Sequence, residues 1–303
     1  MRIEGQRRAA RVIAPNAAVA GFLLWLMAAS VGAAPLSSRI ANYDIDARLD
    51  TANHRVTARE VLMWRNTGGE PAGELYFHLY LNAFANTRSS FIREMRDSVL
   101  DWQRDKPDGW GYQEIATLRV DGNDRIAAIE YVHPDDDNAE DRTVIRIPLD
   151  TPIAAGATAR IEIEFTAQLP KVLARSGYAG PFVFIAQWFP KIGVFEDGTW
   201  NCHQYHLATE FYADFGTYDV RLTVPRTAVV GATGVRQDQR DNPDGTQTVH
   251  YRAEDVHDFA WTVDPRFLEV TDRFDAVNLR LLVQPLHRGQ ALRYLDAVKQ
   301  AMR

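Results

Sequence analysis

Apolar and polar residues alternate over much of the chain after residue 40, and this pattern limits the possible folds more than any other feature. In Tyr43–Leu49 and in Ile161–Phe165, every second residue is apolar and most residues between them are polar or charged. Alternate residues of a β-strand point to opposite faces, so this period predicts strands with one buried face. Comparable segments predict further strands at Val56–Trp64, Leu75–Leu81, Thr143–Leu149, Val183–Trp188, Thr217–Val224, Gln247–Arg252 and Leu279–Val283.

Turn residues separate several of these segments, as in Asn66–Gly69 and in Asn242–Gly245. We therefore expect a mainly β chain, built as a twisted antiparallel sheet or sandwich. Helical spacing is found in two places. Ala83–Trp102 has a mixed pattern that could contain one short helix.

The second helical pattern is Gln290–Met302, where apolar residues recur at the spacing of one helix face. These residues are Ala291, Leu292, Leu295, Val298 and Met302. We expect a helix that leads out of the β domain and packs on something that follows. The alternative is a terminal helix that folds back on its own sheet.

The first 33 residues have the three-part layout of a secretory signal peptide. Four arginines precede the apolar run Ala17–Ala29, and small residues follow it, with Val31–Ala33 as the best cleavage site. The run is shorter than the about 20 apolar residues that span a bilayer. Cleavage near Ala33 is therefore favoured over an uncleaved membrane anchor, and we expect a periplasmic or secreted protein with no stable membrane span.

Cleavage would remove four arginines and one glutamate, which changes the formal net charge from -6 to -9. An acidic exported chain is not expected to bind nucleic acid or anionic membrane surfaces. Its single cysteine, Cys202, cannot form a disulfide within the chain. The acidic segment Asp135–Asp141 lacks the glycine and spacing of a calcium loop, so a solvated hairpin tip is favoured there.

Five segments, in this order and at these separations, carry a resemblance to a known family. They are Phe184–Val194, Asp197–Trp200, Glu210–Val220, Val230–Gly234 and His257–Trp261. Together they resemble the N-terminal β domain of bacterial zinc metallopeptidases similar to aminopeptidase N, the membrane alanyl aminopeptidase. The resemblance covers Ile40 to Arg303 and is carried by the ordered set of segments rather than by any single one.

In that family a thermolysin-like catalytic domain, which binds the zinc ion, follows the β domain. The resemblance therefore implies a β domain at residues 34–285 and the start of a truncated catalytic domain at 286–303. No H-E-x-x-H occurs, and none of the eight histidines supplies its spacing. We expect zinc only in the missing catalytic domain, no activity from this chain alone, and binding of the peptide substrate by the full-length enzyme.

Family β domains contribute one wall of the peptide-binding cleft. By this resemblance, Gln187 and Glu210 are the candidates for contact with a substrate amine. The alternative is structural, with Gln187 bonded to backbone groups and Glu210 ordering a loop.

A local cluster of Cys202, His203, His206 and Glu210 offers side chains that zinc accepts. The H-x-x-H spacing does not place both imidazoles on one helix face as an i, i+4 pair does, and histidines beside aromatic residues commonly form hydrogen bonds instead. We therefore expect no metal site here, with a site at these four residues as the weaker alternative.

Three functions remain open at this point. The first is the non-catalytic front part of an exported zinc aminopeptidase. The second is a complete β-sandwich module that binds a peptide or a carbohydrate on its aromatic residues. The third is an interaction subunit that docks, or associates with itself, through the C-terminal helix.

Overall fold

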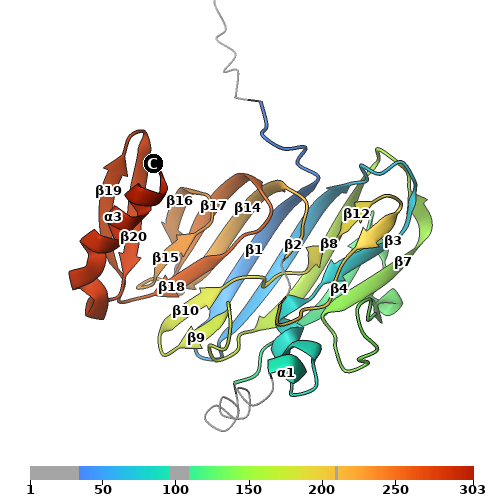
Figure 1. Ribbon diagram of the computed structural model, residues 1–303, viewed down its shortest axis with the longest axis horizontal. Coiled ribbons are helices and arrows are strands. Elements are labelled where there is room, and N and C mark those ends of the chain that lie inside the picture. The colour runs from blue at the N-terminus through green and yellow to red at the C-terminus, as the bar shows by residue number, and fades with distance from the viewer. Residues whose placement is uncertain (1–33, 96–108, 209–210) are drawn as a thin grey trace, which may run out of the picture. The chain divides into compact units, whose positions relative to one another are not determined.

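The computed structural model describes residues 34–95, 109–208 and 211–303, and strands dominate these ranges (Figure 1). The predicted signal peptide, residues 1–33, lies outside the described residues. Pro35–Arg303 forms one compact unit. Among the described residues, no helix has the length and apolar character needed to cross a membrane.

The largest sheet has eight strands. Their spatial order is β16 (Val235–Asp241), β17 (Thr246–Val256), β14 (Gly216–Pro225), β1 (Ala41–Asp50), β2 (Arg55–Arg65), β8 (Thr158–Gln168), β4 (Tyr112–Val120) and β5 (Asn123–Asp124). Neighbouring strands are antiparallel except β1 and β14, which are parallel with Tyr43 opposite Tyr218. The sheet is thus mixed at this one pairing and antiparallel elsewhere.

Two smaller sheets have four strands each. One has the order β15 (Val229–Ala232), β18 (Trp261–Asp264), β10 (Phe182–Ile185) and β9 (Gly177–Ala179). The other has the order β11 (Lys191–Ile192), β3 (Ala72–His78), β7 (Val144–Ile153) and β6 (Glu130–Tyr131). Two hairpins complete the strands, β12 (Val194–Glu196) with β13 (Thr199–Asn201), and β19 (Leu268–Phe274) with β20 (Val277–Val283).

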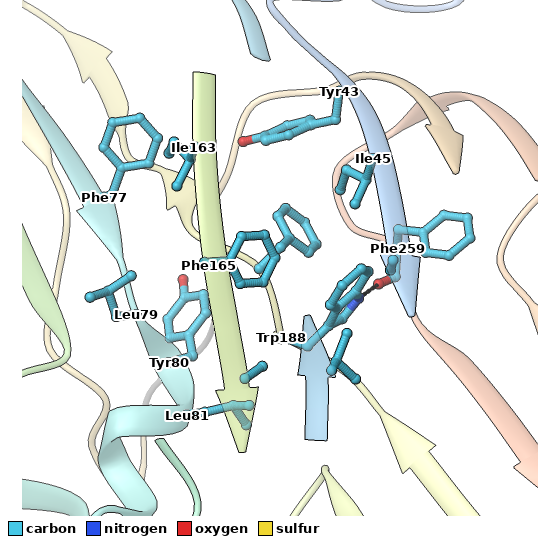
Figure 2. Packing of buried hydrophobic residues seen from close by; sticks show 14 of the residues in the cluster. Tyr43, Ile45, Phe77, Leu79, Tyr80, Leu81, Ile163, Phe165, Trp188 and Phe259 are labelled. Carbon is cyan, nitrogen blue, oxygen red and sulfur yellow. Dashed lines mark hydrogen bonds between the residues drawn. The ribbon is translucent and has the colours of Figure 1, made fainter. Parts of the chain in front are cut away.

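The alternating residues of the large sheet form the core that the sequence predicts. In β1 every second side chain from Ala41 to Leu49 is buried, and β8 repeats this pattern. These side chains share one hydrophobic cluster with residues of both smaller sheets. Figure 2 shows Tyr43, Phe77 and Trp188 among the labelled side chains that meet there. The mainly β, sandwich-like prediction is confirmed.

Two predicted strands end earlier than expected. Leu79 and Leu81 are buried as predicted, but β3 ends at His78 and the chain continues into the 3₁₀ turn η1 (Tyr80–Phe84). The strand predicted at Val183–Trp188 ends at Ile185. Both differences arise where a buried apolar run continues in irregular backbone, because burial alone does not distinguish the two conformations.

Helices are short in the described residues. The helix α1 (Ser90–Met95) lies within Ala83–Trp102, where the sequence predicts one, and part of that segment, 96–102, is outside the described residues. A second 3₁₀ turn, η2, spans Ile126–Ala128. Near the C-terminus a third, η3 (Pro285–Gln290), leads into α3 (Ala291–Ala301), which confirms the predicted C-terminal helix.

The apolar residues of α3 divide between two environments. Ala291 and Leu295 are buried, and α3 contacts β19 and β20. The Nζ atom of Lys299 lies 2.5 Å from Oδ2 of Asp272 on β19. Leu292, in contrast, is 74% exposed. The helix therefore packs on the preceding hairpin with one part of its apolar stripe and leaves the other part exposed.

Candidate functional site

The segment after β10 combines the candidate Gln187 with a well-anchored backbone. Ala186, the first residue of the segment, is held by two hydrogen bonds to Ser176. The Oγ atom of Ser176 accepts a hydrogen bond from Ala186 N at 2.8 Å and donates one to Ala186 O. The two residues after Gln187, Trp188 and Phe189, are aromatic and fully buried. The Nε1 atom of Trp188 donates to Phe259 O at 3.0 Å (Figure 2). The chain on both sides of Gln187 is thus held by the core.

Gln187 itself has an uncommon conformation. Its φ angle is 52°, in the left-handed region that side chains other than glycine seldom adopt. The residue is 8% exposed, and no described residue hydrogen-bonds to its side-chain amide. Backbone strain of this kind persists only where the surroundings impose it, and it is concentrated at binding and catalytic sites. The backbone of Gln187 is therefore held in place, while its side-chain amide has no partner among the described residues.

A buried ion pair follows a few residues later. The Nζ atom of Lys191 lies 3.3 Å from Oδ2 of Asp258, and Lys191 is only 1% exposed. Burial lowers the pKa of Lys191, and the charge of Asp258 opposes this effect. Because Asp258 comes from the segment His257–Trp261, the pair joins two of the segments that carry the family resemblance.

A pair of carboxyl groups, Asp214 and Glu196, is a feature that the sequence did not reveal. Burial, with a smaller contribution from the charge of Glu196, raises the pKa of Asp214 to about 6. The hydroxyl of Tyr212 donates to Glu196 Oε2 at 3.2 Å. Asp214 thus titrates close to neutral pH. Glu210, the second predicted substrate contact, lies outside the described residues.

The predicted Cys/His cluster separates into three different contacts. The Sγ atom of Cys202 lies beside the imidazole of His78. His203 Nδ1 lies 2.5 Å from Asp135 Oδ1, and His206 Nδ1 lies 2.6 Å from Glu94 Oε1.

The surroundings of His206 favour its charged form. Burial lowers its pKa, but the hydrogen bond and charge of Glu94, together with the charges of Asp135 and Asp136, raise it above the ordinary value. His206 Nε2 lies 3.5 Å from Asp135 Oδ2, so Asp135 stands between two histidines. A histidine held between carboxylates is suited to an ion pair.

Zinc requires three or four such side chains around one point. Within residues 34–95, 109–208 and 211–303, no group of three or more His, Cys, Asp or Glu side chains could hold a metal ion. The described part of the chain therefore offers no side-chain group that fits a zinc ion, and we derive no catalytic step through one.

The acidic segment Asp135–Asp141 departs in part from the solvated hairpin tip that the sequence predicts. Asp141 is fully buried and accepts hydrogen bonds from Ser90 N at 3.0 Å and from Thr143 N at 2.9 Å. Asp136 accepts the hydroxyl hydrogen of Ser90 at 2.8 Å. The segment does connect the paired strands β6 and β7, and Asp135 and Asp137 are exposed as predicted. The burial of Asp141 was not predicted, and it arises because carboxylates bond well to the free N–H groups at a helix start, where α1 begins.

Known proteins resemble this chain in structure but not in sequence. No protein-family model matches the sequence, and no curated protein matches it. Among solved structures, an M1 zinc metallopeptidase from Deinococcus radiodurans is similar with a TM-score of 0.44 and 14% identity, over 78% of this chain and 45% of that one. Aminopeptidase A of Legionella pneumophila, in complex with aspartic acid, is similar with a TM-score of 0.50 and 11% identity, over 84% of this chain and 25% of that one.

These comparisons bear on the fold. The chain spans less than half the length of both enzymes. The likeness to the Legionella enzyme extends over 84% of this chain and confirms the expected mainly β fold of an aminopeptidase region.

Proposed function

We propose that this chain is the non-catalytic N-terminal part of an exported zinc-dependent, aminopeptidase-like metallopeptidase, and that it helps to shape the cleft in which the peptide substrate binds. Two observations support the proposal. The first is the shared fold, which is that of a region of a larger peptidase. The second concerns Gln187.

The geometry of Gln187 is the observation that carries the proposal. A residue held in a strained backbone conformation is costly for stability, and a ligand contact gives a reason for that cost. The amide carbonyl can accept hydrogen bonds from the amino group of a peptide, and the NH₂ group can donate to a peptide carbonyl. Because Ser176 and Phe259 anchor the residues on either side, the backbone of Gln187 is held in position before the peptide arrives.

In this proposal, the zinc ion and its ligands belong to a separate catalytic domain. In a catalytic domain, zinc would supply the nucleophile for peptide hydrolysis by activating a water molecule. In this proposal the present chain binds and orients the peptide, while the zinc ligands belong to a catalytic domain.

The coding sequence beyond Arg303 in the natural gene tests this assignment. We expect in-frame codons for H-E-x-x-H followed by a further glutamate. We also expect the purified 303-residue chain to release no aminoacyl chromophore above the rate in buffer. A stop codon directly after Arg303, or chelator-sensitive release by the 303-residue chain, contradicts the proposal.

Export is the second part of the proposal, and the layout of residues 1–33 supports it. Expression of the whole chain in a bacterial host, followed by N-terminal sequencing of the periplasmic fraction, is the test. We expect a mature start at or next to Ala34. Uncleaved protein that stays in the cytoplasm contradicts export.

A further inference from the structure

A groove lies between the start of β3 and the hairpin of β12 and β13, which Figure 1 shows next to each other. Its volume is about 500 Å³, which is within the range of small-molecule sites. Three aromatic residues line it, namely Tyr76, Phe195 and Trp200. Phe195 belongs to the core cluster and Trp200 packs against it, so the core supports this surface, while the proposed peptide contact at Gln187 is not part of the lining.

The aromatic rings of the groove are held rigidly. The ring centroids of Tyr76 and Trp200 are 5.9 Å apart at an interplanar angle of 21°, and those of Phe195 and Trp200 are 5.2 Å apart. Trp200 also packs on the buried Trp64, at 5.3 Å between centroids. Its Nε1 donates to Glu74 O at 3.0 Å. The groove therefore presents a fixed aromatic surface at little cost in conformational entropy on binding.

A fixed carboxylate stands beside these rings. Glu74 lines the groove, and its Oε2 accepts a hydrogen bond from Arg146 Nε at 2.5 Å. Arg146 is in turn held by Glu130, whose Oε2 lies 3.1 Å from Nη1. A carboxylate has about four acceptor positions, so Glu74 can accept further hydrogen bonds from a ligand. Thr199 adds a hydroxyl to the lining.

This set of groups distinguishes between two kinds of ligand. Proline-rich peptides also bind in aromatic grooves, but a polyproline backbone has carbonyl acceptors and no N–H donor, so it would leave the remaining acceptor positions of Glu74 without a partner. Sugars offer the opposite pattern. Each ring has apolar C–H faces that pack on aromatic rings, and hydroxyl groups that donate to a carboxylate.

We propose that this groove binds a neutral carbohydrate. One sugar ring packs against Tyr76 and Trp200, and its hydroxyls donate to Glu74. The site is separate from the proposed peptide contact and does not depend on it.

Gly73 provides a way to close the groove without removing a contact. It lines the groove, a Cβ added to it would meet no atom within 4 Å, and its φ is not in the left-handed region. The variant Gly73→Phe should therefore fold and fill the groove. Gly289→Phe is the matched control, because Gly289 has the same open surroundings and lies in η3, away from the groove lining.

The experiment titrates maltose, cellobiose and diacetylchitobiose into the whole chain, with saturation-transfer NMR and tryptophan fluorescence as readouts. We expect at least one disaccharide to bind with a Kd of about 1 mM, Gly73→Phe to weaken it about tenfold or more, and Gly289→Phe to bind as the unchanged chain does. A decaproline peptide should not compete. The proposal is overturned if no disaccharide binds, if Gly73→Phe binds equally well, or if decaproline displaces the sugar.

Discussion

The Sγ atom of Cys202 lies 3.3 Å from Nε2 of His78, and both side chains are buried. Such proximity resembles a nucleophilic Cys–His pair, but the electrostatics are opposite to what such a pair needs. Burial, aided by the charge of Lys191, lowers the pKa of His78 to about 3, and burial raises the pKa of Cys202. Both groups are therefore neutral at pH 7, so the thiol is not activated as a nucleophile.

We predict that Cys202 is unreactive in the folded chain. Its reaction with a disulfide reagent such as DTNB should be about 100-fold or more slower than in urea-unfolded chain, because the thiol must first be exposed by opening of the structure. The absorbance of the released thiolate measures both rates. Rapid labelling of the native chain at pH 7 would refute a neutral, buried thiol.

The buried Glu60 should make stability depend on pH. Its two carboxyl oxygens have no hydrogen-bond partner among the described residues, and burial raises its pKa well above the ordinary value. A raised pKa in the folded state favours folding below the unfolded value of 4.5, and this contribution is lost as pH rises through the folded pKa. Glu60→Gln removes the ionisation, so we expect it to raise the free energy of unfolding by about 2 kcal/mol at pH 8.

At pH 4 the same substitution should change stability little, because Glu60 is then protonated in the folded state and mostly protonated in the unfolded state. Glu164→Gln, on the exposed face of β8, is the control and should have the same small effect at both pH values. Urea unfolding at the two pH values measures the difference. An equal gain from Glu60→Gln at pH 4 and pH 8 would show that ionisation is not the cause.

We expect that replacing Asp258 and replacing Lys191, the two partners of the buried ion pair, will lower stability by unequal amounts. Asp258→Asn leaves a buried ammonium without its anion, so we expect a loss of about 3 kcal/mol. Lys191→Met replaces the charge by an apolar chain of similar length and should cost clearly less. Urea unfolding of both variants is the measurement, and equal losses would contradict this account.

Two leucines one turn apart on α3 should behave differently. Leu295 is 4% exposed, so Leu295→Ala should lower the free energy of unfolding by about 2–3 kcal/mol. Leu292→Ser removes an exposed apolar side chain, so it should leave stability nearly unchanged and reduce self-association or dye binding. Thermal unfolding and analytical ultracentrifugation separate the two effects. A large stability loss in Leu292→Ser would mean that this residue belongs to the packed face.

The sequence predicts the fold well where its pattern is local. Alternation in Tyr43–Leu49 corresponds to β1 because burial of one sheet face imposes that period. It does not reveal the parallel pairing of β1 with β14, since that contact joins residues far apart along the chain. A partly uncovered stripe on the C-terminal helix is expected from the sequence, but helical spacing does not show that Leu295 is the covered residue and Leu292 the exposed one.

The candidate site was predictable only in part. Gln187 follows from the resemblance of its segment, but its left-handed backbone does not, since nothing in the residue type favours that conformation. Lys191 and Asp258 lie in segments that carry the resemblance. A lysine is seldom fully buried, however, so the buried ion pair between them required the structure. The pKa of Asp214 depends on burial and on Glu196, which are both tertiary effects.

The most direct test of the proposed function is the kinetics of Gln187→Gly in the peptidase made from the natural gene. Glycine adopts the left-handed conformation without strain, so the substitution removes the amide alone. The account predicts zinc-dependent hydrolysis of aminoacyl substrates, a KM about tenfold higher in the variant, and no loss of stability. An unchanged KM, or a natural gene product without zinc-dependent peptidase activity, would contradict it.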